Sequence, residues 1–205
     1  MIEMVEEKEI APFLEGKNIS LIASDLKFVS LYAKWDNDPD FRHVSRNYLP
    51  ISPEAFKKYF EKKQPNPPND IFLNIWHKQD KKLIGHIGFN RIQWADAIAV
   101  IGLMIGEKEY WGKDIGTEAV ALLLEYGFNE LSLFKIMGAM FHINVGSWRV
   151  AEKVGMTREI VLKKQAYMKG NYVDEYQYCM FKDEWQLKRK KFEFLFSSNE
   201  VEVSE

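Results

Sequence analysis

A glycine-punctuated segment of the chain, from Glu107 to Ala119, combines residue types that bind anions through the backbone. Its sequence is Glu-Lys-Glu-Tyr-Trp-Gly-Lys-Asp-Ile-Gly-Thr-Glu-Ala. An apolar run of strand length, Ala97–Ile105, precedes it, and an apolar run at helical spacing, Val120–Phe128, follows it. A turn from a strand into a helix offers several backbone N–H groups and the positive end of the helix dipole. The segment therefore predicts a phosphate-binding turn.

Two common nucleotide-binding turns have other spacings. A P-loop has the pattern Gly-x-x-x-x-Gly-Lys-Ser/Thr, and a dinucleotide-binding turn has the pattern Gly-x-Gly-x-x-Gly. Neither pattern occurs in the chain, where Gly112 and Gly116 punctuate the turn. The predicted site therefore belongs to another class of phosphate binder.

The composition favours a globular protein without a metal or nucleic-acid function. The 205 residues, 46% of them hydrophobic, suit one domain with tails or at most two small domains. A formal net charge of −2 differs from the strongly basic character of nucleic-acid-binding domains. The single Cys179 excludes an internal disulfide, and the spacing of the histidines is not that of metal ligands.

Membrane and export signals are absent from the sequence. No apolar run reaches the roughly 18 residues of a membrane span, and the acidic N-terminus does not resemble a signal peptide. We therefore expect a cytoplasmic protein with no membrane partner, no nucleic-acid partner and no metal.

Capping residues and prolines predict two helices in the first third of the chain. Asp25 resembles the N-cap of a helix that ends at the break over residues 37–40. Ser52 and Pro53 open a second helix, which ends before Pro65. Two further helices are expected, one from the glycine turn to about residue 129 and one over residues 145–154.

The remaining apolar segments read as strands. They are Ile19–Ala23, Ile71–His77, Leu83–Ile92, Ala97–Ile105, Lys135–Phe141, Arg158–Met168 and Tyr172–Phe181. The order of elements predicts a single mixed α/β domain, with a central sheet of about seven strands and four main helices. A right-handed crossover should make the strand before the glycine turn parallel to the strand that begins at Lys135. Residues 17–185 form the predicted domain, residues 1–16 an N-terminal tail, and residues 186–205 a C-terminal extension.

A series of short motifs stands in a fixed order along residues 17–185. They are Asn37-Asp-Pro39, Leu83-Ile-Gly-His-Ile-Gly88, Ile105-Gly-x3-Tyr-Trp-Gly-Lys-Asp-Ile-Gly-Thr-Glu-Ala119, Asn144-x-x-Ser147, Ala151-Glu-Lys-Val-Gly-Met156, Gly170-x-Tyr-x-Asp-Glu175 and Asp183-Glu-Trp185. Each motif alone is weak, but in this order and at these distances the series resembles the GNAT superfamily of acyl-CoA N-acyltransferases. Within it, the chain resembles the branch of ribosomal-protein N-terminal and spermidine acetyltransferases.

The resemblance implies a site for acetyl-CoA as co-substrate. Two parallel central strands would splay apart, the pantetheine arm would pair with the end of the first strand, and the pyrophosphate would bind the glycine turn. The implied cofactor-binding residues are Leu103, Met104, Ile105, Trp111, Gly112, Lys113, Asp114, Ile115, Gly116, Thr117, Asn144 and Ser147. Other roles stay open for some of them: Lys113 can be solvated, Asn144 can cap a helix, and Ser147 can bond back to its own helix.

The implied reaction is direct acetyl transfer to a primary amine, which is a protein N-terminus, a polyamine or another small amine. Backbone N–H groups around Met104 and Ile105 would polarise the thioester carbonyl. Ser147 is the candidate proton donor to the departing sulfur, and Glu175 is the candidate base. Weaker base candidates are Glu107, Glu109 and Asp174.

Three positions depart from the family pattern. Asp114 stands where the turn usually has glycine, Val100 where relatives often carry a glutamate, and Ala151 where many relatives carry a tyrosine acid. These departures support an alternative function, a CoA-binding module with little or no catalytic activity.

The acceptor side is less defined. Asp36, Asp38, Arg46 and Tyr48 fall in the segment that lines the acceptor side in relatives. Acidic residues there suit a cationic amine, but Asp38 beside Pro39 fits helix punctuation equally well. The sequence does not separate a protein N-terminus from a small amine as acceptor, and it leaves open whether the chain forms a homodimer.

Overall fold

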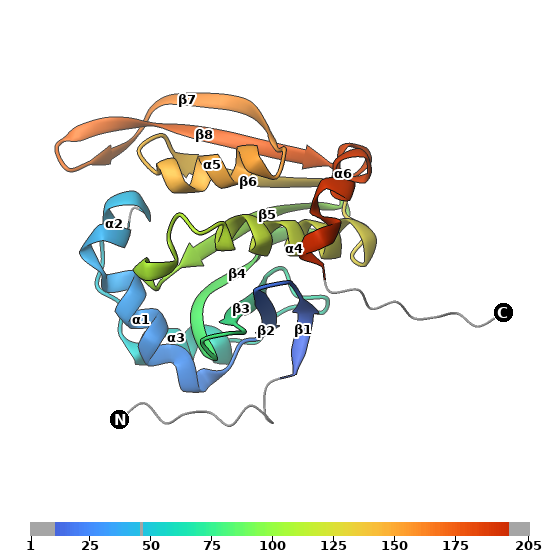
Figure 1. The fold of residues 1–205 in the computed structure, drawn as a ribbon. Coiled ribbons are helices and arrows are strands. Elements are labelled where there is room, and N and C mark those ends of the chain that lie inside the picture. The colour runs from blue at the N-terminus through green and yellow to red at the C-terminus, as the bar shows by residue number, and fades with distance from the viewer. Residues whose placement is uncertain (1–10, 46, 197–205) are drawn as a thin grey trace.

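The computed structural model describes residues 11–45 and 47–196, which form a twisted eight-stranded sheet with helices on both faces (Figure 1). The strand order is β1-β2-β3-β4-β5-β6-β8-β7. The strands are β1 (Pro12–Glu15), β2 (Ile19–Ala23), β3 (Ile71–His77), β4 (Lys82–Gln93), β5 (Ile98–Ile105), β6 (Lys135–Phe141), β7 (Thr157–Met168) and β8 (Asn171–Phe181). The predicted single mixed α/β domain is confirmed, with one strand more than expected.

The α-helices comprise the four predicted ones and two others. They are α1 (Val29–Asn37), α2 (Pro39–Ser45), α3 (Pro53–Glu61), α4 (Ile115–Asn129), α5 (Val145–Lys153) and α6 (Lys182–Lys188). Short 3-10 helices are η2 (Leu26–Phe28), η3 (Lys108–Tyr110) and η4 (Arg189–Leu195). The sequence predicted the helix break near Pro39 but not α2, which begins at Pro39 itself. Asp38 caps this helix, because its Oδ1 accepts from the N–H groups of Asp40 (2.9 Å) and Phe41 (3.3 Å).

The two faces of the sheet carry different helices and separate cores. On one face, α4 packs on the sheet and α5 packs on α4, with Leu123, Phe128 and Ile136 fully buried between them and the strands. On the other face, α1 and α3 close a second core around Tyr32 and Trp35. The two faces can therefore present different ligands to the same strands.

The central strands β5 and β6 run parallel and separate along their length. Their paired residues are confined to Ile98–Val100 on β5 and Lys135–Met137 on β6. Beyond these pairs each strand continues for several residues on its own side of a gap, and α4 makes the crossover between them. The predicted parallel crossover is confirmed.

Helix α4 is tied to the sheet by a buried carboxylate within the glycine segment. Glu118 accepts hydrogen bonds from Asn18 N (2.7 Å), Asn18 Nδ2 (2.7 Å) and Ile19 N (3.2 Å). A buried carboxylate with three donors is satisfied, so Glu118 holds the start of β2 against the first turns of α4.

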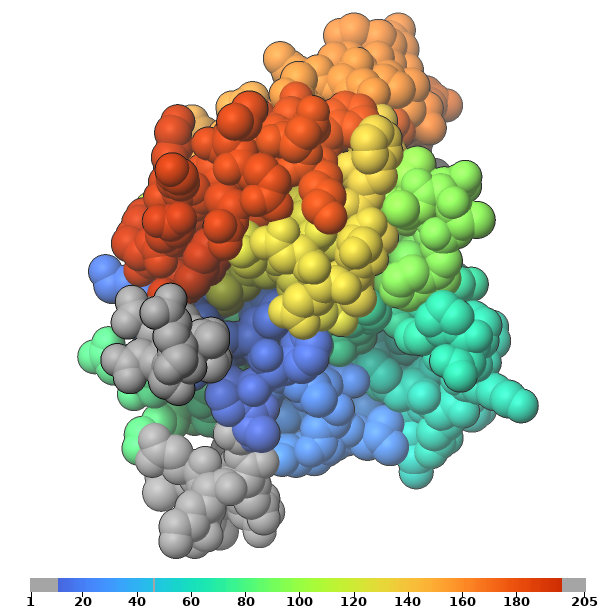
Figure 2. Space-filling view, turned by 90° about the vertical axis from the view of Figure 1, so that its right-hand side faces the viewer, coloured from blue at the N-terminus to red at the C-terminus, as the bar shows by residue number. Residues whose placement is uncertain are grey.

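Parts of both predicted tails are ordered elements. Residues 12–15 form β1 on the edge of the sheet, because they pair with β2. After Trp185, Phe192 stacks on its indole at 5.6 Å and Leu195 is buried. Figure 2 shows this C-terminal segment in red beside the blue N-terminal strands, where Lys17 N–H donates to Leu195 O at 2.8 Å. Residues 1–10 and 197–205 of the predicted tails lie outside the described residues.

Candidate acyl-transfer site

The glycine turn before α4 has a left-handed backbone at two positions. Gly112 has φ +73° and Asp114 has φ +60°, and α4 begins at the next residue, Ile115. Glycine adopts this region without a steric cost, and aspartate tolerates it better than most residues. A Cβ added at Gly112 would meet no atom within 4 Å, so Gly112 serves the turn's conformation rather than close packing.

Gly116 has a different role from Gly112. A Cβ added there would lie 3.2 Å from Val150 Cγ2 of α5 and 3.4 Å from Leu103 Cδ2 of β5. The absent side chain therefore lets α4, α5 and β5 meet at one point. This contact places the start of α4 directly beside the region where β5 and β6 part.

Asp114 is held by a partner from the neighbouring helix. Its carboxylate pairs with Lys153 Nζ at the end of α5, and its side chain caps no backbone N–H of α4. Both side chains are more than half exposed, so the pair contributes little to stability. It does offset the negative charge that Asp114 brings to the turn.

The register of β5 decides which of its backbone groups face the gap. Gly106 N–H donates to Ile84 O at 2.9 Å, and the β4–β5 register pairs His86 with Met104. Hydrogen-bonded and non-bonded pairs alternate along an antiparallel ladder, so the backbone N–H and C=O of Met104 point toward β4. The N–H of Met104 therefore does not face the gap, and the expectation that it polarises a carbonyl there is wrong.

The neighbours of Met104 have the opposite orientation. The backbone groups of Leu103 and Ile105 point away from β4, toward the gap. Trp111 Nε1 donates to Ile105 O at 2.7 Å. This bond occupies the carbonyl of Ile105 and connects the glycine turn to the end of β5. Trp111, predicted as a cofactor contact, thus has a structural role as well.

The other predicted cofactor residues of the turn differ in exposure. Lys113 is exposed, with its Nζ 5.7 Å from the Tyr110 ring centroid. Ile115 is buried in the main core. The hydroxyl of Thr117, in the first turn of α4, is buried and has no hydrogen-bond partner among the described residues. A buried polar atom left without a partner is unusual, and it lies at the helix end that favours anions.

Asn144 and Ser147 lie together at the start of α5. Asn144 Oδ1 accepts from Ser147 N at 3.2 Å and caps the helix, so the capping role left open for Asn144 is present. The nearby Trp148 indole donates to His142 O at 3.1 Å and fixes the chain before the helix. Both predicted residues are half-buried.

Glu175 does not lie on the same face of the sheet as Ser147. Tyr178 OH of β8 donates to Glu152 of α5 at 2.9 Å, so even-numbered residues of β8 face α5. Side chains alternate along a strand, and Glu175 therefore points to the opposite face. There its Oε1 accepts from Gln177 Nε2 at 3.0 Å.

The weaker base candidates already have partners. Glu107 Oε1 accepts from the Trp35 indole at 2.8 Å. Glu109 pairs with Lys82 at 2.7 Å, and the pair lowers the pKa of Glu109. Lys163 holds Asp174 at 2.8 Å and lowers its pKa in the same way. These three carboxylates act as structural or surface acids.

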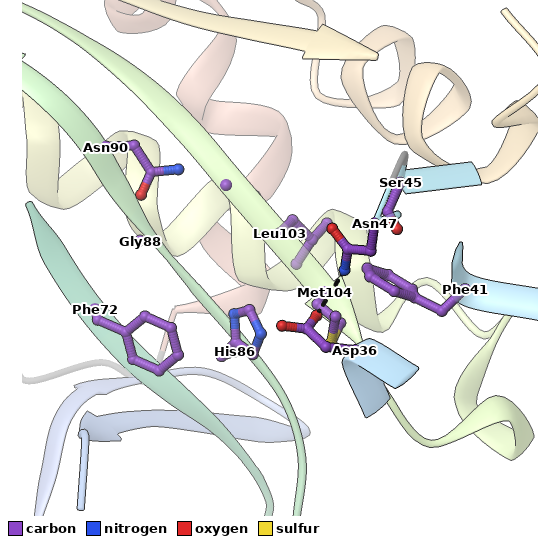
Figure 3. Close-up of a pocket in the computed structure, with 11 residues that line it drawn as sticks. Asp36, Phe41, Ser45, Asn47, Phe72, His86, Gly88, Asn90, Leu103 and Met104 are labelled. Atoms are coloured by element: carbon purple, nitrogen blue, oxygen red, sulfur yellow. Dashed lines mark hydrogen bonds between the residues drawn. The ribbon is translucent and has the colours of Figure 1, made fainter. Parts of the chain in front are cut away.

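A pocket of about 240 Å³ opens on the α1–α3 face, next to the middle of β5 (Figure 3). It is lined by Asp36, Phe41, Ser45, Asn47, Phe72, His86, Gly88, Asn90, Gly102, Leu103 and Met104. In Figure 3, His86 and Phe72 lie on one side and Asp36, Asn47 and Phe41 on the other, with the Asp36 carboxylate directed toward His86. Asp36 is the one carboxylate among these residues.

Burial changes both titratable groups of the pocket. Desolvation raises the pKa of Asp36, and the hydrogen bond from Asn47 Nδ2 (3.1 Å) opposes that rise. Desolvation lowers the pKa of His86 to about 4, so its imidazole is neutral at pH 7. The Phe72 ring, at a centroid distance of 4.6 Å, covers the imidazole. The pocket at neutral pH therefore has one carboxylate facing a neutral ring.

The remaining acceptor-side predictions have mixed outcomes. Asp38 caps α2 and pairs with Lys108 at 2.9 Å, which is the punctuation role that the sequence left open. Tyr48 OH donates to Tyr167 O at 2.9 Å. Arg46 lies outside the described residues. The sequence did not identify His86 as part of the site, although it lies within a motif that carried the resemblance.

Residues 11–45 and 47–196 contain neither a candidate metal cluster nor a membrane-spanning helix. No group of three or more His, Cys, Asp or Glu side chains there is arranged to hold a metal ion. No helix in the same part of the chain is long and apolar enough to cross a membrane.

Residues 21–157 match the acetyltransferase (GNAT) domain family. Since this match covers more than half of the 205 residues, the chain belongs to the GNAT family and is an acetyltransferase. The departures at Val100, Ala151 and Asp114, which supported a non-catalytic CoA-binding module, therefore occur within an enzyme family.

Individual relatives agree with the family. The chain is 35% identical over 141 residues to the uncharacterized N-acetyltransferase YnaD of Bacillus subtilis, with 67% of this chain and 81% of that protein covered. It is 32% identical to the uncharacterized N-acetyltransferase YoaA of the same species, with 83% and 97% covered. A crystal structure of spermidine N-acetyltransferase from Vibrio cholerae in complex with CoA and spermine has the same fold, with a TM-score of 0.74 at 19% identity, and 82% and 98% covered.

Proposed function

We propose that the protein transfers the acetyl group of acetyl-CoA to a primary amine bound in the Asp36 pocket. One observation carries the proposal: residues 102–104 of β5 line that pocket, and the same stretch of strand borders the gap between β5 and β6. A thioester in the gap and an amine in the pocket would meet across one strand. Holding two reactants in such a geometry supplies much of the rate of a bimolecular reaction.

Three features of the cofactor side fit acetyl-CoA. Backbone groups of Leu103 and Ile105 face the gap and suit pairing with the amides of a pantetheine arm. The left-handed turn at Gly112 leads into the positive end of α4. The unpartnered Thr117 hydroxyl is a donor for a phosphate oxygen. Lys113, Asn144 and Ser147 border the same region and stay candidate contacts.

Acetyl-CoA supplies an acetyl group activated as a thioester. The amine nitrogen forms the new C–N bond at the carbonyl carbon, the C–S bond breaks, and the thiol leaves with a proton. The attacking nitrogen must lose a proton, and Asp36 is the best-placed group to receive it, because it lines the pocket and burial raises its pKa. Glu175, the base predicted from the sequence, lies on β8 and does not line this pocket. It is therefore the second candidate for the base, after Asp36.

Ser147 is the proposed proton donor to the departing sulfur. It lies at the start of α5, on the α4 side of the sheet, and the pocket with Asp36 lies on the α1–α3 side. Proton removal and proton donation would then occur on opposite sides of the reacting carbonyl.

Two measurements test the proposal together. Millimolar CoA should raise the thermal midpoint of the purified chain, since a ligand of the folded state stabilises by RT ln(1 + [L]/Kd), and ATP at the same concentration should not. Thiol release from acetyl-CoA should then depend on an added amine, chosen from peptides, polyamines and amino sugars. A chain that CoA fails to stabilise, or that releases no thiol with any amine, would contradict the proposal.

A further inference from the structure

A second pocket adjoins the Asp36 pocket and has the opposite charge. It has a volume of about 260 Å³ and is lined by Pro39, Arg42, His43, Asn47, Tyr48, Met168 and Lys169. These residues come from α2, from the loop after it and from the turn between β7 and β8. The lining includes two cationic side chains and no carboxylate.

Asn47 is the wall shared by the two pockets. Its side-chain Nδ2 donates to Asp36 in the first pocket at 3.1 Å, and its backbone oxygen accepts from Arg42 Nε in the second at 3.0 Å. The two pockets therefore adjoin at Asn47.

The positive charge of the second pocket is not cancelled by the acids of α2. Lys108 binds both of them, Asp38 at 2.9 Å and Asp40 at 2.7 Å. Among the described residues, no carboxylate forms a salt bridge with Arg42 or Lys169. Their charges are available to a ligand.

The walls of the second pocket are fixed to each other. Tyr48 OH donates to Tyr167 O of the β7–β8 hairpin at 2.9 Å. This bond connects the loop after α2 to the hairpin that carries Met168 and Lys169. The cationic side chains thus stand on two elements that are linked next to the pocket.

We infer that the acceptor is a small amine which also carries an acidic group, a carboxylate or a phosphate, on a short spacer. This inference rests on the proposed function: the amino group occupies the Asp36 pocket, and the acidic group binds Arg42 and Lys169. A linear polyamine would place a second ammonium beside these cations, and two like charges 4 Å apart repel by about 1 kcal/mol even in water. The acceptor therefore differs in charge from the spermine named in the Vibrio cholerae complex.

Three series of amines of equal length test the inference. Straight-chain ω-amino acids, their ω-amino amides and diamines, each with two to six methylene groups, differ in the charge at the far end alone. With saturating acetyl-CoA, kcat/KM from thiol release should fall in the order acid, amide, diamine, with a ratio of about tenfold between acid and diamine at the best length. Diamines that react as well as the acids would overturn the inference and leave the proposed function standing. No thiol release with any amine would contradict both.

Two variants connect the preference to the pocket. Lys169→Gln should lower kcat/KM for the amino acid about fivefold and leave the amide unchanged, and Arg42→Gln should do the same. Arg91→Gln is the matched control, because Arg91 is exposed, lies outside both pockets and shares the positive φ of Lys169. Equal losses for acid and amide in both pocket variants would show a structural role and contradict the inference.

Discussion

The cofactor side and the acceptor side of this enzyme are built in different ways. The cofactor side consists mainly of backbone: the turn at Gly112 and Asp114, the first turn of α4, and the edge of β5. The proposed acceptor side consists mainly of side chains from α1, α2, the loop after α2, β3, β4 and β5 that converge on one pocket. Apart from Asn144 and Ser147 at the start of α5, the cofactor side is continuous in sequence, whereas the acceptor side is assembled from distant segments.

The difference has a consequence for specificity. A backbone site binds a ligand common to a whole family, because any sequence that makes the turn presents the same N–H groups. A side-chain pocket changes its ligand with each substitution. In the proposed site, the choice of acceptor therefore depends on residues such as Asp36 and Arg42, rather than on the glycine turn.

The cofactor side should be most sensitive to added volume. Gly116→Val should abolish measurable CoA binding, because even its Cβ would lie 3.2 Å from Val150 and force α4 away from α5. Titration calorimetry with CoA measures the loss, and a thermal scan shows whether the variant folds. Gly116→Ala, which adds the Cβ alone, should weaken binding less. Normal CoA affinity in a folded Gly116→Val protein would mean that the cofactor binds elsewhere.

The acceptor side should be most sensitive to loss of one charge. Asp36→Asn should lower kcat by about 100-fold or more, the usual scale of general base catalysis, with CoA affinity unchanged. Because burial raises the pKa of Asp36, wild-type activity should fall with decreasing pH at a higher pH than an ordinary aspartate would give.

The pH profile also separates chemistry from binding. The acid limb should vanish in Asp36→Asn and return in Asp36→Glu. Asp40→Asn is the control, since Asp40 is exposed and paired with Lys108. An unchanged acid limb in Asp36→Asn would assign the proton to another group, with Glu175→Gln the next variant to measure.

A smaller loss of kcat is expected from removing the proposed proton donor, Ser147. Ser147→Ala should lower kcat by about 10- to 100-fold, since a serine donor assists the departing sulfur without being the only source of a proton. CoA affinity should stay nearly the same, because Asn144 still caps α5. Pre-steady-state thiol release measures the step directly. An unaffected rate would make Ser147 a helix residue and water the donor.

The smallest expected change is an increase in CoA affinity. Asp114→Gly should tighten CoA binding by about fivefold, because it removes a carboxylate from the turn, relieves a left-handed φ of +60° and releases Lys153 for the pyrophosphate. Titration calorimetry at low salt shows the effect best, since screening weakens interactions between exposed charges. Lys153→Ala should weaken binding in the Asp114→Gly background. Weaker binding in Asp114→Gly itself would mean that the carboxylate stabilises the turn.

The sequence predicted the cofactor side better than the acceptor side. The crossover, the turn before α4 and all strands except β1 were predicted because their signals are local: apolar runs, caps and glycines. Helix α2 was missed because it is short and begins at Pro39, a proline that reads as a break. The register error at Met104 has a similar origin, since the orientation of a strand's N–H groups is decided by its neighbour β4.

The acceptor pocket needed contacts that no local pattern contains. His86 was visible within a motif, yet its position opposite Asp36 depends on the pairing of β4 with β5 and on the approach of α1. Glu118 shows that a residue within a predicted functional segment can have a structural role. It belongs to the segment that predicted the cofactor turn, and it serves to anchor Asn18 and Ile19.

The bond between Lys17 and Leu195, together with the bridge between Gly16 and Phe196, brings the beginning and the end of the described chain side by side. Domains whose ends lie together tolerate circular permutation, so a short linker across this seam should allow new ends to be opened elsewhere. The loop of residues 62–70, remote in sequence from every residue of either pocket except Phe72, is a suitable place. Such a permutant would carry fused partners at that loop while keeping the seam intact.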